Sequence, residues 1–395
     1  MNRRISSRVE SIAPSLTLAI TAKAKAMKAA GEPVVSFGVG EPDFSTPENV
    51  VNAAKKALDD GQTKYTPSSG LLPLRKAICD KLERDNGISY EPSQIIVSNG
   101  AKHSIFNACF AVLEAGDEVI IPAPYWLTYP EVVKVCGGVP VILDCKKENG
   151  YKFTPEQLKG VITDKTKMLI FNSPSNPTGA VYSESEVRAI AKVCEEAGIF
   201  VLSDEIYEKL CYNGVKPFSV AACSEKMKDL TITVNGVSKT YAMTGWRVGY
   251  LAAPKDVAKA IDSFQSHATS NACSISQYAT IEALASPEAD VEKMVNVFAS
   301  RREKMLALIS EIDGVSAVAP DGAFYVMLDV SETYGGKIDG SVAFADALLE
   351  AQKVAVVPGA AFGADGCVRL SYSLSEEDIE EGLKRIKAFV ESIKA

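Results

Sequence analysis

Thr233-Val-Asn-Gly-Val-Ser-Lys-Thr-Tyr-Ala-Met-Thr-Gly-Trp-Arg247 combines a short apolar run with small and polar residues that surround a lysine. Lys239 offers an amine nucleophile, and its small neighbours would let a ligand approach the backbone. Arg247 carries a permanent cation whose planar guanidinium suits a phosphate or a carboxylate. An amine beside an anion site favours a cofactor with an aldehyde and a phosphate, and pyridoxal phosphate has both. Taken alone, the segment fits a surface lysine near a surface arginine even better.

The segment Val201-Leu-Ser-Asp-Glu-Ile-Tyr207 places a carboxylate directly after an apolar run. Ligands bind at strand ends in α/β proteins. Asp204 could keep a pyridine nitrogen protonated there, because an opposite charge in a dry site favours the charged form. The competing interpretation is that Asp204 caps the next turn and that Tyr207 belongs to the core.

Two further loops follow apolar runs and carry residues suited to a ligand. In residues 171–179, Asn176 precedes a proline that restricts its backbone, so its amide is a rigidly placed donor for a phenolate oxygen. In residues 97–104, Gly100 and Ala101 come before a helical pattern. Small residues at a helix start would let a phosphate reach backbone N–H groups.

Together the four segments resemble those of fold-type I, class I pyridoxal-phosphate-dependent aminotransferases, and specifically the bacterial aspartate aminotransferase subgroup with Ser-Lys-x-x-x-Met-Thr-Gly-Trp-Arg. The resemblance runs from about Arg8 to the C-terminal helix. Further matches are Val39-Gly-Glu-Pro-Asp-Phe44, Lys64-Tyr-Thr-Pro67 with Gly70 and Leu74-Arg75, Pro122-Ala-Pro-Tyr-Trp126, Gly322-Ala-Phe-Tyr325 and Val368-Arg-Leu-Ser-Tyr372. The resemblance implies a pyridoxal 5'-phosphate cofactor and a homodimer with shared active sites.

The same resemblance assigns roles to the residues of these segments. Lys239 would bond covalently to the cofactor and then move a proton, acting as nucleophile and general acid/base. Asp204 would pair with the ring nitrogen, and Tyr207 and Asn176 would hydrogen-bond the ring oxygen. The remaining cofactor contacts would be Trp126 on the ring face and, around the phosphate, Gly100, Ala101, Lys102, Ser238, Arg247 and Tyr65 of a second subunit.

Substrate contacts are implied at four positions. Arg369 would grip the α-carboxylate in a bidentate way, and the other contacts would be Gly40 through its backbone, Trp126 and Asn176. Candidate residues around the substrate side chain are Ile12, Ala13, Leu16, Thr17, Lys102, Ser270 and Asn271. The chain departs from the family pattern at Gly236, where many relatives have a hydroxyl. It also departs at Ala13, where some dicarboxylate-specific relatives, including prephenate users, have a lysine.

Strand-like runs alternate with amphipathic windows, which favours parallel strands with helices on both faces. The expected strands span residues 95–97, 118–121, 139–143, 168–171, 200–202 and 231–234, and the expected helices include 104–113, 183–197 and 288–312. The resemblance adds a large domain with a mostly parallel seven-stranded sheet, and a smaller α+β domain. We expect the large cofactor-binding domain at 46–286 and the small domain at 1–45 and 287–395.

Composition disfavours several other classes. A formal charge of −8 without a basic cluster argues against nucleic-acid and anionic-membrane partners. With two histidines far apart, a zinc site or a serine/histidine triad has little support. No run approaches the roughly 20 apolar residues of a membrane helix, and the first eight residues lack the apolar core of a signal peptide, so we expect a cytoplasmic enzyme.

The expected activity is transfer of an amino group from an L-amino acid, with aspartate favoured, to 2-oxoglutarate by a ping-pong mechanism. Alanine, aromatic or prephenate transamination and Cβ–S lyase chemistry on the same scaffold stay open, because all of these reactions share the cofactor residues. A non-catalytic ligand-binding regulator is a further alternative.

Overall fold

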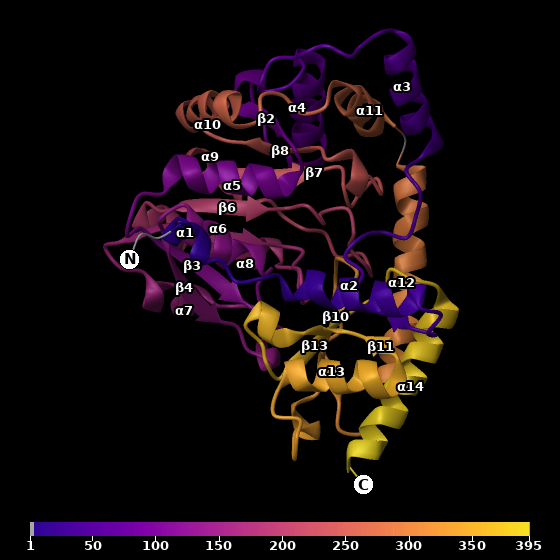
Figure 1. Ribbon diagram of the computed structural model, residues 1–395. Helices are drawn as coiled ribbons and strands as arrows, with labels where there is room; N and C mark the ends of the chain where they lie inside the picture. The colour runs from indigo at the N-terminus through magenta and orange to yellow at the C-terminus, as the bar shows by residue number, and fades with distance from the viewer. Residues whose placement is uncertain (1–3, 287, 395) are drawn as a thin grey trace.

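The computed structural model describes residues 4–286 and 288–394, so residues 1–3, 287 and 395 of the expected small domain lie outside the described chain. A seven-stranded sheet runs through the larger part of the molecule in the order β2-β8-β7-β6-β5-β3-β4 (Figure 1). Its strands are β2 (Ile95–Ser98), β3 (Glu118–Ala123), β4 (Val139–Asp144), β5 (Thr166–Asn172), β6 (Phe200–Asp204), β7 (Thr231–Gly236) and β8 (Gly249–Ala252). The six strands expected from the sequence all form.

The sheet is mostly parallel, as expected. Strands β4, β3, β5, β6 and β7 pair in parallel, whereas β8 runs antiparallel to both β7 and β2. The sequence interpretation did not include β8, which begins with a glycine and comes just after the turn-rich segment that ends at Arg247. Strand β8 brings the chain back from the loop that holds Lys239 and Arg247.

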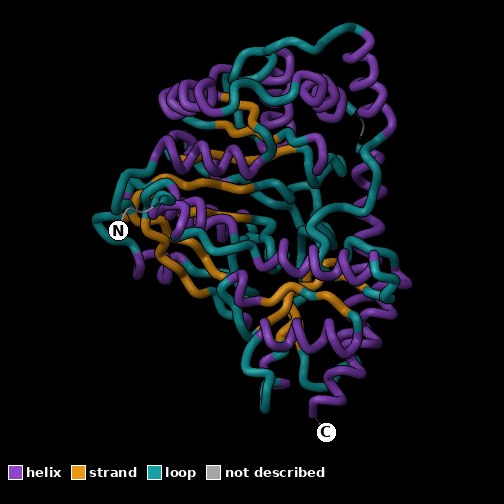
Figure 2. The backbone as a smooth tube through the Cα atoms, in the orientation of Figure 1, coloured by secondary structure: helices purple, strands orange, loops and turns teal. Residues whose placement is uncertain are grey.

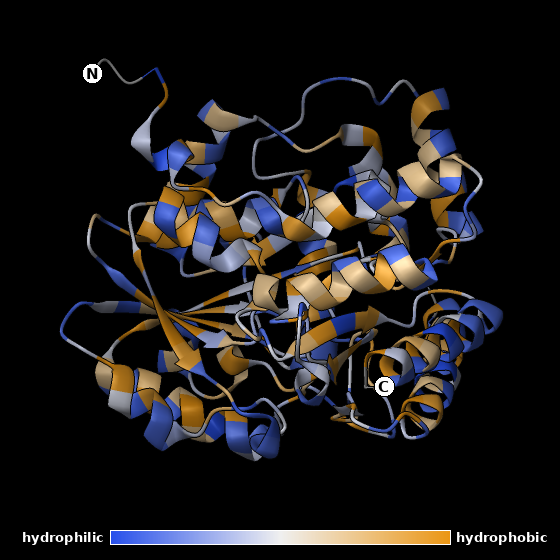
Figure 3. Ribbon diagram, turned by 60° about the horizontal axis from the view of Figure 1, so that its bottom comes forward, coloured by the Kyte–Doolittle hydropathy of each residue, from blue (hydrophilic) through white to orange (hydrophobic). Residues whose placement is uncertain are grey.

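Helices cover both faces of the sheet, and alternate residues of each strand pack into separate cores on the two faces. On one face Ile121 and Ile170 pack with α5 (Ala101–Val112), α6 (Thr128–Val135) and α10 (Lys255–Ala268). On the other face Ile120 and Leu169 pack with α7 (Pro155–Val161), α8 (Glu184–Ala197) and α9 (Glu225–Asp229). Figure 3 shows the hydrophobic strands inside and helices of mixed hydropathy around them.

Helix α8 illustrates how the local sequence sets these elements. Ser183 and Glu186 form a reciprocal capping box at its start, and Gly198 takes the left-handed conformation at its end with φ 67°. Val187, Ile190 and Cys194 lie on its buried face at helical spacing. The expected helix at 183–197 is therefore confirmed. At the β2 edge, α3 (Glu48–Asp59), α4 (Leu72–Asn86) and α11 (Ser274–Ala285) form a third cluster.

The smaller part of the molecule contains a four-stranded antiparallel sheet, β12-β13-β10-β9, and a parallel pair, β1-β11. These strands are β1 (Val35–Ser36), β9 (Ser316–Ala317), β10 (Tyr325–Asp329), β11 (Val354–Ala355), β12 (Val357–Pro358) and β13 (Cys367–Ser371). The helices with them are α2 (Leu16–Ala29), α12 (Ala289–Ile309), α13 (Ser341–Gln352) and α14 (Glu376–Lys394). Figure 2 shows this second group of strands apart from the large sheet.

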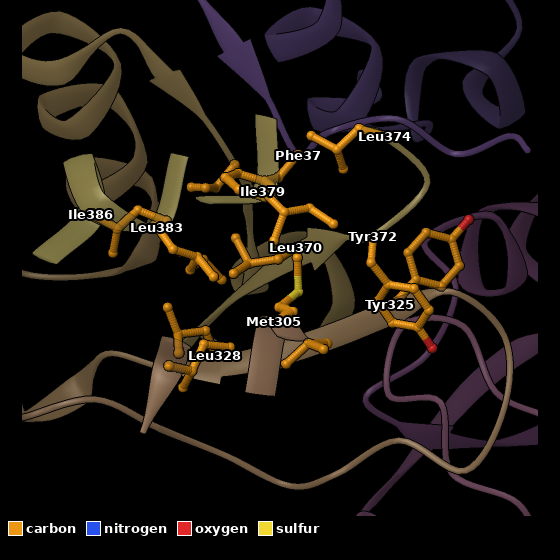
Figure 4. Packing of buried hydrophobic residues seen from close by; sticks show 14 of the residues in the cluster. Phe37, Met305, Tyr325, Leu328, Leu370, Tyr372, Leu374, Ile379, Leu383 and Ile386 are labelled. Atoms are coloured by element: carbon orange, nitrogen blue, oxygen red, sulfur yellow. The ribbon is translucent and has the colours of Figure 1, made fainter. Parts of the chain in front are cut away.

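The core of the smaller part joins segments that lie far apart in the chain. Phe37, Met305, Leu328, Leu370 and Leu383 meet in one buried cluster (Figure 4). The N-terminal segment around Phe37 therefore packs with the C-terminal part of the chain. Helix α1 (Ser7–Glu10) differs: it lies by α6, where the backbone N–H of Ala13 donates to Glu131 at 3.1 Å.

The parallel strands bring their carboxyl ends to one edge of the large sheet, and this edge faces the smaller part. Asp204 ends β6, Gly236 ends β7 three residues before Lys239, and Gly100 follows β2. The motifs that the sequence places after apolar runs therefore converge in space. None of the helices within residues 4–286 and 288–394 combines the length and apolar character needed to cross a membrane.

Candidate active site

A cavity of about 410 Å³ lies between the carboxyl edge of the large sheet and the smaller part. Eleven of the thirteen site residues expected from the sequence line it: Gly40, Ala101, Lys102, Trp126, Asn176, Asp204, Tyr207, Ser238, Lys239, Arg247 and Arg369. Gly100 and Tyr65 are the two that do not. The residues that line it come from both the N-terminal and C-terminal segments as well as the large sheet.

Lys239 lies in a tight turn after β7, in which the N–H of Tyr241 donates to the carbonyl of Val237 at 3.2 Å. Its Nζ donates to the carbonyl of Gly40 at 2.5 Å. Burial lowers the pKa of Lys239 to about 8; Glu41 and Asp204 oppose the shift, and Arg369 and Arg247 add to it. The pKa is lowered enough that an appreciable fraction of the amine is uncharged near neutral pH, which a nucleophile needs.

Asp204 is 3% exposed and ends strand β6. The phenol of Tyr129 donates to its Oδ2 at 2.7 Å, and the N–H of Ile206 donates to its Oδ1 at 3.2 Å. Asp204 therefore does cap the next turn while also lining the cavity. Burial raises its pKa to about 6, although both hydrogen bonds and Lys239 oppose this shift. A cation in the cavity would offset the burial, since no described lysine or arginine forms an ion pair with Asp204.

Two hydrogen-bonded pairs close the far wall of the cavity. The hydroxyls of Tyr207 and Tyr325 lie 3.1 Å apart, and burial holds the pKa of Tyr207 well above its usual value. Arg369 on β13 donates from Nη1 to Oδ1 of Asn176 at 2.9 Å. The Arg369 side chain stacks over the ring of Tyr325, 4.2 Å from its centroid.

Arg369 is a buried cation without an acidic partner among the described residues. It is 4% exposed, and its Nε has no hydrogen-bond partner there. Burial lowers its pKa. An unpaired buried guanidinium is costly, and a carboxylate on it would satisfy both charge and donors.

The opposite end of the cavity has the features of an anion site. Gly100 caps α5 with φ 88°, and this helix begins three residues earlier than expected, at Ala101. The guanidinium of Arg247 occupies the space where a side chain at position 100 would lie: an added Cβ would stand 2.4 Å from its Nη2. Arg247 donates to the carbonyls of Thr244 and Asn99, at 2.9 and 3.2 Å, and forms no ion pair with a described carboxylate.

Lys102 and Trp126 lie together at the cavity wall, with Nζ of Lys102 4.7 Å from the indole centroid. Burial and the nearby Arg247 lower the pKa of Lys102. Tyr65, in contrast, is 90% exposed and does not reach this cavity. Among the candidates for contact with the substrate side chain, Thr17 and Lys102 line the cavity, whereas Ile12, Ala13, Leu16, Ser270 and Asn271 do not.

Several residues that line the cavity were not assigned a role from the sequence: Thr21, Lys25, Glu41, Tyr129, Asn172, Thr244 and Tyr325. Tyr129 lies three residues after Trp126, and Tyr325 closes a motif already noted, so both had a weak signal. Asn172 binds the carbonyl of Asp204 at 2.9 Å and the N–H of Asn176 at 2.9 Å, linking two strand ends. Only tertiary structure shows these contacts.

The residues present fit a cofactor with a cationic ring, an aldehyde and a phosphate. Asp204 is a buried acid without a cation, Lys239 is an amine with a lowered pKa, and Gly100 leaves room for the guanidinium of Arg247 at the start of α5. The cations on the cavity lining are Lys25, Lys102, Lys239, Arg247 and Arg369, and the acids are Glu41 and Asp204. This excess of positive charge suits a phosphate together with an acidic substrate.

Comparison with known proteins identifies one family over most of the chain. The family described as aminotransferase class I and II matches residues 32–386. An aspartate aminotransferase from Bacillus sp. (strain YM-2) is 51% identical over 391 residues, which cover 99% of this chain and all of that protein. A probable aspartate/prephenate aminotransferase of Aquifex aeolicus is 48% identical over the full length of both chains.

Solved structures resemble the fold equally closely. The aspartate aminotransferase of Rhizobium meliloti superimposes with a TM-score of 0.95 at 42% identity, covering 99% of each chain. The aspartate aminotransferase of Thermus thermophilus with maleate superimposes with a TM-score of 0.94 at 43% identity, covering 98% of this chain and 99% of that one. Both comparisons extend over the large and the small parts of the molecule.

Proposed function

Because the chain belongs to the class I and II aminotransferases, which depend on pyridoxal 5'-phosphate, we propose that it transfers the amino group of L-aspartate to 2-oxoglutarate by a ping-pong mechanism. One observation carries this proposal: a single cavity brings together Lys239, whose pKa is lowered, with the buried Asp204 and the buried Arg369, neither of which has an ion-pair partner among the described residues. The residue roles that follow belong to the same proposal.

When bound, the cofactor supplies an aldehyde for a lysine amine and an electron-withdrawing ring. Asp204 would hold its ring nitrogen protonated, with Tyr129 keeping the carboxylate oriented. Tyr207 and Asn176 would donate hydrogen bonds to its ring oxygen, and Trp126 would lie on its face. The phosphate would be held by the backbone N–H groups of Gly100, Ala101 and Lys102 at the start of α5. The side chains of Ser238 and Arg247, and Tyr65 of a second subunit, would complete its contacts.

Lys239 would serve twice. Its Nζ would hold the cofactor aldehyde, and once the substrate amine takes its place, the freed lysine amine would move the proton of the substrate Cα to the cofactor carbon. A pKa of about 8 suits both steps, because a general base is most effective when its pKa lies near the working pH.

Arg369 would bind the substrate α-carboxylate through two parallel N–H donors, with Gly40, Trp126 and Asn176 completing the contacts. The preference for a second carboxylate is supported by Lys102 and Thr17 on the cavity wall and by the names of the relatives. Maleate, which accompanies the Thermus enzyme, is also a dicarboxylate.

Prephenate is the second candidate substrate, because four relatives are described as aspartate/prephenate or probable aspartate/prephenate aminotransferases. Ala13, which stands where some prephenate users have a lysine, does not line the cavity and weighs against it. The proposed enzyme is a cytoplasmic homodimer, and this agrees with the exposed position of Tyr65.

The test is a set of half-reactions with purified enzyme. Aspartate, alanine, phenylalanine and glutamate are each added without an acceptor, and conversion of the bound cofactor from its aldehyde to its amine form is followed by absorbance. Aspartate should convert it fastest. If aspartate fails while another donor succeeds, the substrate assignment is wrong; if Lys239→Ala keeps full activity, the mechanism is wrong.

A further inference from the structure

A buried ion pair lies next to the cavity wall without lining it. Glu208 follows Tyr207 in the chain and is 8% exposed, and it pairs with Lys81 of α4, which is 3% exposed. Neither residue is part of the cavity lining. Taking two charges out of water costs more than their attraction commonly returns, so stability alone is a poor reason for this pair.

The pair belongs to a closed set of hydrogen bonds that joins three segments. Oε1 of Glu208 accepts from Nδ2 of Asn235 at 2.8 Å, and Oε2 accepts from Nδ2 of Asn86 at 2.9 Å. Nζ of Lys81 donates to Oδ1 of Asn86 at 2.8 Å. The end of α4, the segment after β6 and the end of strand β7 are therefore linked to one another through a single carboxylate.

Asn235 connects this carboxylate to the turn that carries Lys239. It lies on β7 opposite Tyr250 of β8 and is 1% exposed. Its own Oδ1 accepts from the N–H of Gly236 at 2.7 Å, which fixes the exit of the strand. Three residues later comes Lys239. At its other end, Glu208 is covalently next to Tyr207.

We propose that Glu208, held by Lys81, is a positioning residue that fixes the Lys239 turn relative to Tyr207. This role rests on the proposed function, which makes Lys239 and Tyr207 cofactor-binding groups. Because Asn235 on β7 hydrogen-bonds directly to Glu208, the distance between strand β7 and the segment of Tyr207 is fixed by this contact and not by the intervening loop. Loss of the connection loosens the turn and admits water around the Lys239 amine.

Other charged groups surround the pair and stay in place in the proposed variants. Asp85 lies 3.8 Å from Nζ of Lys81 and 3.2 Å from that of Lys209. Burial alone would raise the pKa of Asp85, but Arg84, Lys81 and Lys209 together hold it below its usual value. The carboxylates of Glu205 and Glu208 also repel each other, and the phenols of Tyr241 and Tyr250 lie near Glu208.

Two variants cut the connection at different ends. Glu208→Gln removes the charge and keeps the shape, whereas Asn235→Ala removes the strand contact and leaves the ion pair. In cofactor-free protein, each variant should raise the pKa of Lys239 by about one unit. Below the pKa, this rise leaves about tenfold less free amine. The readout is the pH dependence of Lys239 acylation, followed by peptide mapping. The double variant should show no additional shift, because both changes remove the same connection.

Glu186→Gln is the control for the loss of an ion pair away from the cavity. Glu186 pairs with Lys152 and accepts from the N–H of Ser183, and it does not line the cavity. This variant should lower the unfolding midpoint and leave Lys239 unchanged. If Glu208→Gln and Asn235→Ala also lower the midpoint but leave the pKa of Lys239 at its wild-type value, the positioning role is overturned. If Glu208→Gln does not fold, Asn235→Ala decides the question.

Borohydride reduction of wild-type holoenzyme separates this proposal from the proposed function. Cofactor fixed to the peptide containing Lys239 supports the function. Its absence would overturn that function and the positioning role with it. Fixation in the wild type together with unchanged variants would overturn the positioning role alone.

Discussion

Tyr129→Phe removes one oxygen from the most protected part of the cavity. The phenol of Tyr129 donates to Asp204 at 2.7 Å, and both side chains are buried. The ring of Tyr129 also meets Trp126 edge-on, with centroids 5.4 Å apart, and this contact survives in phenylalanine. The substitution therefore tests the hydrogen bond with little change in packing.

The expected effect is a further rise in the pKa of Asp204, from about 6. A hydrogen bond to a charged group is worth about 1.5–3 kcal/mol, which corresponds to about one to two pKa units. The folded-state pKa of Asp204 is already above its unfolded value, so its contribution to stability is present at low pH and is lost as pH rises through the folded pKa. In Tyr129→Phe that loss continues to a higher pH. The difference in unfolding free energy between wild type and variant should therefore grow between about pH 6 and about pH 8.

Urea unfolding of cofactor-free protein across this pH range measures the difference, and carboxyl ¹³C NMR reports the titration of Asp204 directly. Tyr182→Phe is the control, because Tyr182 is buried but its hydroxyl accepts from the backbone N–H of Phe153 and does not serve a carboxylate. Its destabilisation should not depend on pH in this range. If Tyr129→Phe follows the same flat profile and Asp204 titrates as in wild type, the reasoning is refuted.

Arg369→Lys should raise KM for both substrates about 10- to 100-fold, because a lysine keeps the charge but loses the second N–H contact to the α-carboxylate; steady-state kinetics with each substrate measures this. In cofactor-free protein, acylation of Lys239 should have a midpoint near pH 8, and a midpoint at the ordinary lysine value would contradict the burial argument. Mixing inactive Tyr65→Ala and Lys239→Ala subunits should restore about a quarter of wild-type activity, because half of the dimers are hybrids with one complete site; no recovery would exclude a shared site. Gly100→Ala should weaken cofactor binding at least about tenfold with the fold retained, since its Cβ would displace the guanidinium of Arg247 and strain a φ of 88°; equilibrium titration with the cofactor checks this.

The sequence predicted the parts of the site that follow strands. Apolar runs ending in Asp204 or leading to Lys239 specify both the strand and the place where the polar residue emerges, so the two could be assigned together. Helix α8 was predictable for a similar reason, because Ser183 and Glu186 mark its start chemically. The start of α5 at Ala101 was not, since a glycine cap leaves no hydrophobic period to detect.

Contacts made across the fold lay beyond sequence reasoning. Tyr129 and Asp204 are 75 residues apart, and Arg369 is 193 residues from Asn176, so no local pattern joins either pair. Strand β8 was missed because it begins with a glycine just after a turn-rich segment, so its apolar run has no clear start. The exposed Tyr65 shows another limit, since its predicted partner is a second chain.

The pKa values of Asp204 and Lys239 are shifted toward each other, and these shifts couple folding to cofactor binding. Burial raises the pKa of Asp204 to about 6 and lowers that of Lys239 to about 8. Asp204 stabilises the fold at low pH and loses that contribution as pH rises through about 6. For Lys239 the contribution is present at high pH and is lost as pH falls through about 8. Between these values both groups are charged in a poorly solvated site, and Asp204 alone costs about 3 kcal/mol there. A ligand with a cationic ring nitrogen and an aldehyde removes both penalties at once, because it pairs the carboxylate and converts the amine. Bonding to the aldehyde releases the Lys239 proton, so the lowered pKa of Lys239 lets the cavity bind such a ligand closer to neutral pH than an ordinary lysine would.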